Sequence, residues 1–263
     1  EIKNNGAYDY GGGAYIRAEA QPTFNDVVIN GNTSNNGGGI YLTTNAILEI
    51  TSTNISANTA YQDGGGIYSY GSSIVIMNNS EITSNTSLNN GAGIYITGDS
   101  QLQLYSVNVA SNHASLYGGG VYLSGSSTIS IQGSEINGNS SGQGGGLYVT
   151  GTSASLIDST TINSNISASY GGGIKGYDNA IITMNDTKVN SNTSSNDGGG
   201  IHGAQQSDIT LINSEINNNV TDTSAVDTSY GGGVYLSGSS TIIIQDSEIN
   251  ENISHKGGGL YVT

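Results

Sequence analysis

The stretch YGGGVYLSGSSTI occurs twice in this chain, as Tyr117–Ile129 and again as Tyr230–Ile242. The similarity extends further, because Tyr117–Thr150 and Tyr230–Thr263 are identical at 28 of 34 positions and lie 113 residues apart. A catalytic centre needs only one copy of its residues, whereas duplication lengthens a repetitive structure. The duplicated stretch therefore indicates a repeat protein in which the repeated residues build the fold and do not form a catalytic site.

Apolar and polar residues alternate within this stretch. In an extended chain Val121 and Leu123 face one side and Tyr122 faces the other, and after a Ser-Gly-Ser-Ser turn the alternation resumes with Ile129 and Ile131. A period of two, interrupted by Gly, Ser and Asn turns, predicts short β-strands. The high glycine content also disfavours helices.

The stretch belongs to a repeat that covers the whole chain. Glycine triplets, one of them Gly-Ala-Gly, begin at Gly11, Gly37, Gly64, Gly91, Gly118, Gly144, Gly171, Gly198, Gly231 and Gly257. An apolar-x-x-Asn unit precedes each triplet, with its Asn at Asn5, Asn32, Asn58, Asn85, Asn112, Asn139, Asn165, Asn192, Asn219 and Asn252. The distance from a triplet to the next such Asn is always 21 residues. Constant spacing of this kind is what stacking of equivalent coils requires.

Aligned by their triplets, the repeats form columns of similar residues. One column reads Phe24, Ile50, Met77, Leu104, Ile131, Ile157, Met184, Leu211 and Ile244. Stacked coils would place these side chains in one continuous core, with neighbouring strands about 4.8 Å apart. The sequence predicts an all-β parallel β-helix with about nine to ten coils of 26–27 residues and three short strands per coil. We expect one domain over 1–263, part of a longer repetitive chain, with a longer loop at 220–230.

The Asn column has a structural explanation. Stacked Asn side chains satisfy backbone groups at a turn and bond to one another, so we expect a structural Asn ladder along the rod.

The two motifs together resemble the repeats of the chlamydial-type polymorphic outer-membrane protein family. That family pairs Gly-Gly-Ala-[Ile/Leu/Val] with Phe-x-x-Asn in autotransporter passengers exposed at the cell surface. The resemblance covers all ten repeats, although Gly stands here where the family has Ala, and Ile or Val where it has Phe. It implies a right-handed β-helix, an extracellular or cell-surface location and a role in adhesion.

The composition of the chain disfavours two classes of partner, nucleic acids and membranes. The chain has 263 residues, no Cys, one Pro and a net charge of −15, with five basic against twenty acidic residues. This charge disfavours nucleic acid, and the absence of a long apolar run disfavours direct membrane insertion. Glu1–Gly6 shows no signal-peptide pattern, so we expect a mature or excised segment.

Catalytic and metal-binding patterns are weak. A polysaccharide hydrolase needs converging carboxylates, but the outward column of Glu81, Glu135, Glu215 and Glu248 is interrupted by other residues. The histidines, His113, His202 and His255, lie on different coils and show no Ser or Cys partner pattern in the sequence. We therefore expect no enzyme activity, no cofactor and no metal site, with a polysaccharide-active β-helix enzyme as the remaining catalytic alternative.

One outward column is aromatic. It reads Tyr15, Tyr41, Tyr68, Tyr95, Tyr122, Tyr148, Lys175, His202, Tyr235 and Tyr261. One interpretation is a stacked ladder that stabilises the sheet. The other is a binding surface of exposed rings for glycans or another protein.

These observations predict a non-enzymatic extracellular rod with a structural or adhesive role, whose partner is a glycan or protein of a host or neighbouring cell. The alternative is a self-assembling extracellular filament joined end to end, because uncapped coils present unpaired strand edges.

Overall fold

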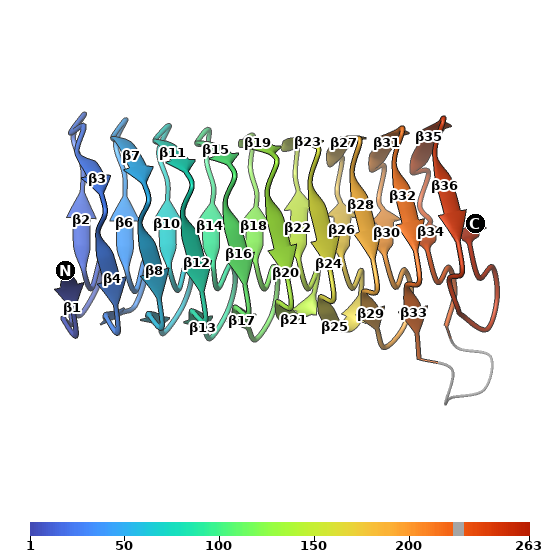
Figure 1. The fold of residues 1–263 in the computed structure, drawn as a ribbon, viewed down its shortest axis with the longest axis horizontal. Helices are drawn as coiled ribbons and strands as arrows, with labels where there is room; N and C mark the ends of the chain where they lie inside the picture. The colour runs from blue at the N-terminus through green and yellow to red at the C-terminus, as the bar shows by residue number, and fades with distance from the viewer. Residues whose placement is uncertain (223–228) are drawn as a thin grey trace.

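The computed structural model describes residues 1–222 and 229–263 and shows a rod of stacked coils, with the two ends of the chain at opposite ends of the rod (Figure 1). The described residues form strands and connections, and no helix among them has the length and apolar character that crossing a membrane requires. Each coil adds one strand to as many as four parallel sheets, and the strands of each sheet follow one another in chain order.

Each strand of the first sheet begins directly after a glycine triplet. Its ten strands are β2 (Ala14–Ile16), β6 (Ile40–Leu42), β10 (Ile67–Ser69), β14 (Ile94–Ile96), β18 (Val121–Leu123), β22 (Leu147–Thr150), β26 (Ile174–Tyr177), β30 (Ile201–Ala204), β34 (Val234–Leu236) and β37 (Leu260–Val262).

The second sheet forms the upper side of the rod in Figure 1. Its nine strands are β3 (Thr23–Asn25), β7 (Ile47–Thr51), β11 (Ile74–Asn78), β15 (Gln101–Tyr105), β19 (Thr128–Gln132), β23 (Ala154–Asp158), β27 (Ile181–Asn185), β31 (Asp208–Ile212) and β35 (Thr241–Gln245).

Each strand of the third sheet ends shortly before the Asn of the apolar-x-x-Asn unit, which is the residue that forms the Asn ladder. Its ten strands are β1 (Ile2–Lys3), β4 (Val28–Asn30), β8 (Asn54–Ser56), β12 (Glu81–Thr83), β16 (Asn108–Ala110), β20 (Glu135–Asn137), β24 (Thr161–Asn163), β28 (Lys188–Asn190), β32 (Glu215–Asn217) and β36 (Glu248–Asn250).

The fourth sheet follows the ladder Asn and lies along the lower side of the rod in Figure 1. Its eight strands are β5 (Thr33–Ser34), β9 (Thr59–Ala60), β13 (Thr86–Ser87), β17 (His113–Ala114), β21 (Ser140–Gln143), β25 (Ile166–Tyr170), β29 (Thr193–Ser194) and β33 (Val220–Thr221). The sequence predicted three strands per coil, and the structure adds this fourth one. Most of these strands have two residues, and a two-residue strand is too short for alternation to reveal.

Register between coils is uniform in the first three sheets, whereas in the fourth sheet the pairing of β21 with β25 shifts between Ser141 and Gln143. In the first sheet Tyr68 pairs with Tyr95, and in the second sheet Met77 pairs with Leu104, so that equivalent residues lie side by side. The core is one column of apolar side chains through the rod, and Ile50, Met77 and Leu104 are fully buried within it. Full burial of a side chain of this size contributes about 1.5–3 kcal/mol, and stacking extends that contribution from coil to coil. The prediction of a stacked solenoid is thus confirmed.

The glycine triplets allow neighbouring coils to approach closely. Gly118 has a φ of 63°, in the left-handed region that favours glycine. A Cβ atom on Gly119 would lie 2.5 Å from the carbonyl oxygen of Gly145, and one on Gly120 would lie 2.6 Å from that of Gly146. The triplet is therefore a consequence of coil spacing. The predicted loop at 220–230 falls largely on residues 223–228, which lie outside the described residues.

Candidate functional site

The tyrosine column of the first sheet forms a continuous stack. The ring centroids of Tyr41, Tyr68, Tyr95 and Tyr122 are 4.8–4.9 Å apart, with interplanar angles of 11–13°. Tyr148 continues the stack 5.3 Å from Tyr122. The faces of these inner rings are therefore already occupied by their neighbours.

A second row of tyrosines covers the side of this stack. Tyr117, which precedes a glycine triplet, lies 5.0 Å from Tyr148, and Tyr10 lies 4.6 Å from Tyr41. As a result, the side chains of Tyr41 and Tyr148 are buried, whereas Tyr15 at the end of the column is 48% exposed. Tyr68, Tyr95 and Tyr122 are half-buried, so the inner part of the column keeps some ring surface open to solvent, and a binding role for it stays a prediction. Alternation predicts the outward direction of these rings but does not show what packs beside them.

Burial also changes the acidity of these phenols. Loss of solvent, together with smaller effects of the neighbouring Tyr10 and Tyr15, raises the pKa of Tyr41 to about 12. Burial likewise raises the pKa values of Tyr68 and Tyr122. The inner rings are thus kept uncharged, as close stacking requires.

Lys175 is the residue that interrupts the stack. It is 3% exposed, and its Nζ lies 2.7 Å from Nδ1 of His202 and 4.8 Å from the centre of the Tyr170 ring. His202, also buried, continues the stack, because its ring lies 4.7 Å from that of Tyr235 at an angle of 29°. Lys175 and His202 both stand in place of a tyrosine in this column, but only Lys175 interrupts the stack, because an imidazole stacks much as a phenol does.

The electrostatics of this pair follow from burial. Loss of solvent lowers the pKa of Lys175 to about 7, while the nearby Asp197 opposes the change. Burial and the Lys175 amine together lower the pKa of His202 well below its usual range. Burial raises the pKa of Asp197, although its carboxylate accepts a hydrogen bond of 3.0 Å from the backbone N–H of Tyr230. The interruption is a set of buried and half-buried groups, Lys175, His202 and Asp197, for which burial makes charge unfavourable.

The Asn ladder runs through the corner between the third and fourth sheets. The Oδ1 atom of Asn112 accepts hydrogen bonds from the backbone N–H and the side-chain amide of Asn85, at 2.9 and 3.0 Å. The Nδ2 atom of Asn112 donates to the carbonyl of Ile82 and to Oδ1 of Asn139, both at 2.9 Å. The same pattern recurs at neighbouring coils, and the ladder residues from Asn32 to Asn219 are fully buried. Each amide thus bonds one coil to the next and cannot contact an external partner.

Two histidines have serine partners that the sequence analysis did not identify. Nδ1 of His113 lies 2.9 Å from Oγ of Ser140, and Nδ1 of His255 lies 3.0 Å from Oγ of Ser229. The partners are 27 and 26 residues apart, which is the length of one coil. Comparing residues at this offset would have revealed them.

The acidic column is interrupted, as the sequence indicates, by Asn108, Thr161 and Lys188. Among the described glutamates of this column, only Glu215 and Glu248 occupy paired positions on neighbouring strands, β32 and β36. Glu215 forms an ion pair of 3.1 Å with Lys188, and Glu248 accepts a hydrogen bond from Asn250. Among the described residues, no three His, Cys, Asp or Glu side chains lie close enough together to hold a metal ion.

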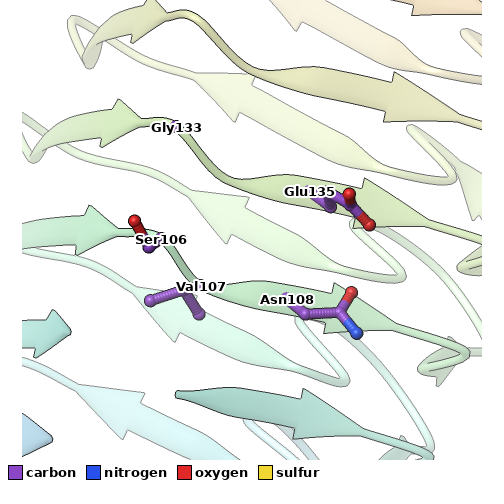
Figure 2. Close-up of a pocket in the computed structure, with 5 residues that line it drawn as sticks. All are labelled: Ser106, Val107, Asn108, Gly133 and Glu135. Carbon is purple, nitrogen blue, oxygen red and sulfur yellow. The ribbon is translucent and has the colours of Figure 1, made fainter. Parts of the chain in front are cut away.

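Shallow grooves lie at the bend between the second and third sheets. Figure 2 shows one of about 280 Å³, in which Asn108 and Glu135 point in the same direction from neighbouring strands. An equivalent groove of about 290 Å³ lies two coils away, with Asn54 and Glu81 in the corresponding positions. The Nδ2 atom of Asn54 donates to Glu81, so the polar groups of that groove already bond to each other.

A larger groove of about 510 Å³ lies on the fourth sheet. It extends from His113 on β17, past Ser140 on β21, to Ile166 on β25. Volumes in this range are typical of small-molecule sites. This groove is the most spacious of the three described here.

A family model for the right-handed β-helix region matches residues 1–109 and 38–216. These matches cover most of the chain, and the chain therefore belongs to the right-handed β-helix family. Comparison with curated proteins and with solved structures gives no match.

Proposed function

We propose that this chain is a rigid, non-enzymatic rod of an extracellular surface protein, with repeats of the polymorphic outer-membrane type, and that it acts as stalk and adhesive surface. The observation that supports this proposal is the continuity of the two ladders. Polar and aromatic side chains that could serve catalysis instead form the same coil-to-coil contacts along the rod, such as those of Asn112 with Asn139 and of Tyr68 with Tyr95. Such contacts fix a long surface in one geometry, which suits display and attachment.

Binding to intact cells tests this proposal. Beads coated with the folded chain are expected to adhere to cell surfaces in a saturable manner, and soluble chain is expected to compete. A heat-unfolded sample is the control, because unfolded chain loses the rod but keeps the charge. Absence of competable adhesion to any cell tested would contradict the adhesive role.

An enzyme assay tests the catalytic alternative. Incubation with acidic and neutral polysaccharides is expected to release no new chain ends. If release occurs and is lost in Glu215→Gln or Glu248→Gln, the paired carboxylates are catalytic and the proposal of a non-enzymatic rod is wrong.

End-to-end association is a second candidate function. The repeat itself favours this candidate, because equivalent strands of neighbouring coils pair in register, as β10 does with β14, and strands of two copies could pair in the same way. Sedimentation at increasing concentration should then show assemblies, whereas a constant monomer mass would contradict this candidate.

A further inference from the structure

The groove on the fourth sheet lies where the connection length changes. The connection from the ladder Asn to the glycine triplet spans five residues at Asn139–Gly144 and six at the neighbouring Asn112–Gly118 and Asn165–Gly171. The short connection lies close to the preceding one, because a Cβ atom on Gly142 would lie 2.6 Å from the carbonyl oxygen of Leu116. The pairing of β21 with β25 also shifts register here, between Ser141 and Gln143, and the hollow of about 510 Å³ lies beside this shift.

The lining provides hydrogen-bonding groups. The His113 ring is exposed and bonds through Nδ1 to Ser140, which leaves Nε2 directed away from that bond. The hydroxyls of Ser115 and Ser195 are exposed and have no hydrogen bond to any described residue. Three coils thus present hydroxyl and imidazole groups to one space.

The lining also provides an apolar surface. Ile166 is 55% exposed although it lies within a strand. In the same column, Thr59, Thr86 and Thr193 occupy neighbouring positions. An exposed isoleucine beside free hydroxyls suits a ligand that carries both C–H and O–H groups.

Charge limits the ligand further. No Lys, Arg, Asp or Glu lines the groove, so the lining offers a charged ligand no partner of opposite charge. The net charge of −15 repels anions from the whole molecule. The ligand is therefore neutral.

The surrounding strands have no free edge for an added peptide strand. The backbone N–H groups of Ser140, Ile166 and Ser195 all donate to carbonyls of the preceding coil, at 2.8–3.1 Å. A peptide could not pair with the sheet here, and the side chains must supply recognition.

We propose that this groove binds two adjacent neutral sugar residues of a surface glycan, one with its C–H face on Ile166 and a hydroxyl bonded to Ser195, and the next with hydroxyls bonded to His113 and Ser115. This inference rests on the proposed adhesive function and names its ligand class.

Two variants test the groove. Ile166→Thr replaces the apolar surface with the residue found elsewhere in the column, and insertion of one serine after Gly142 restores the longer connection and fills the hollow. Ile253→Thr is the matched control, because Ile253 is also 55% exposed but does not line the groove. Unchanged thermal unfolding of each variant shows that the fold is retained.

The probes are neutral oligosaccharides of glucose, galactose, mannose and N-acetylglucosamine, with sialylated and sulfated oligosaccharides for comparison, titrated while amide NMR shifts are followed. We expect a neutral probe to shift the amides of Ser140 and Ile166. Ile166→Thr should weaken binding roughly tenfold, as the loss of a methylene-sized contact does. The serine insertion should abolish binding, and Ile253→Thr should leave it unchanged.

Three results would overturn the inference: binding that both groove variants retain, binding of charged probes alone, and the absence of any neutral probe that binds. In the last case, persistent adhesion of coated beads to cells would leave the adhesive rod in place and reject only the groove. Loss of cell adhesion with intact sugar binding would instead reject the adhesive role.

Discussion

The second and third glycines of a triplet have different surroundings. The repeat that begins at Gly91 carries Ala92 in the second position, where it is fully buried, so a methyl group is accommodated there. The third position holds glycine in every repeat, and a Cβ atom on Gly120 would lie 2.6 Å from the carbonyl oxygen of Gly146 and 3.1 Å from Nδ2 of Asn139. A Cβ atom on Gly119 would lie 2.5 Å from the carbonyl oxygens of Gly145 and Ser140, so it is the presence of Ala92, and not a wider space, that shows the second position can adjust to a methyl group.

Gly120→Ala should therefore destabilise the rod by about 1–3 kcal/mol, the usual cost of overpacking. Gly119→Ala, equivalent to Ala92, should cost less. Thermal and denaturant unfolding of the two variants make the comparison. Equal stability of Gly120→Ala and the wild type would indicate that this position tolerates Ala, as the polymorphic outer-membrane repeats do.

Lys175 is the residue whose chemistry fits its surroundings least. A tyrosine at this position would fill the interruption, and the coil of Tyr117 and Tyr122 shows that tyrosines at both equivalent positions are compatible. We expect Lys175→Tyr to stabilise the rod by about 1 kcal/mol, the scale of one added aromatic contact.

The pH dependence of unfolding provides a second measurement on Lys175. The pKa is about 7 in the folded chain and near 10.5 when unfolded, so between these values the unfolded chain binds the extra proton. Stability should rise with pH through this window, and Lys175→Tyr should remove the rise. A wild-type stability that stays flat from pH 7 to 10 would show that the amine remains charged in the fold.

At the scale of elements, the tyrosine ladder is a stabilising structure first. Replacing Tyr68, Tyr95 and Tyr122 with Thr removes ring contacts worth about 0.5–1.5 kcal/mol each beyond the area they bury. We expect a clear fall in the melting temperature with cell adhesion retained by the folded protein.

The matched control for that triple variant replaces Tyr8, Tyr61 and Tyr70, which are 88%, 56% and 49% exposed. It should change stability little. An intact melting temperature with lost adhesion in the ladder variant would show instead that the ladder is the binding surface.

Shortening the connection after Asn219 should leave the stability of the neighbouring coils unchanged. The hydroxyls of Thr221 and Ser229 are 2.9 Å apart, so the two sides of residues 223–228 already meet. Deleting these six residues restores the usual connection length, and the melting temperature should stay within a few degrees of wild type. A large drop would show that the longer connection supports the coils.

The sequence predicted the strands and the core better than it predicted the side-chain contacts and the groove on the surface. Alternation and the constant triplet-to-Asn spacing identify three strands and the core column, because both derive directly from coil stacking. They do not show that Tyr117 packs over Tyr148, or that His113 meets Ser140, because these contacts depend on neighbouring coils. The groove lies where the connection length changes by one residue and the fourth sheet shifts register, and its lining becomes visible only when the coils are stacked.

At the scale of the whole molecule, each coil contacts mainly its two neighbours. A destabilising substitution in the core should therefore affect the adjacent coils more than the distant ones. Ile131 is fully buried in the core column, and Ile131→Asp would place a carboxylate there at a cost of several kcal/mol. Hydrogen exchange should accelerate first in the coils adjacent to Ile131 and last at the ends of the rod. A uniform loss of protection along the rod would show that it unfolds as one unit.

The uniform register of the first three sheets has a genetic consequence. Because each coil presents nearly the same surface to the next, misaligned recombination within the gene can add or remove whole coils in frame, and the new neighbours already fit. The near-identical segments Tyr117–Thr150 and Tyr230–Thr263 are the kind of sequence at which such exchange begins. Rod length can therefore change in a single inherited event, without any new packing having to evolve.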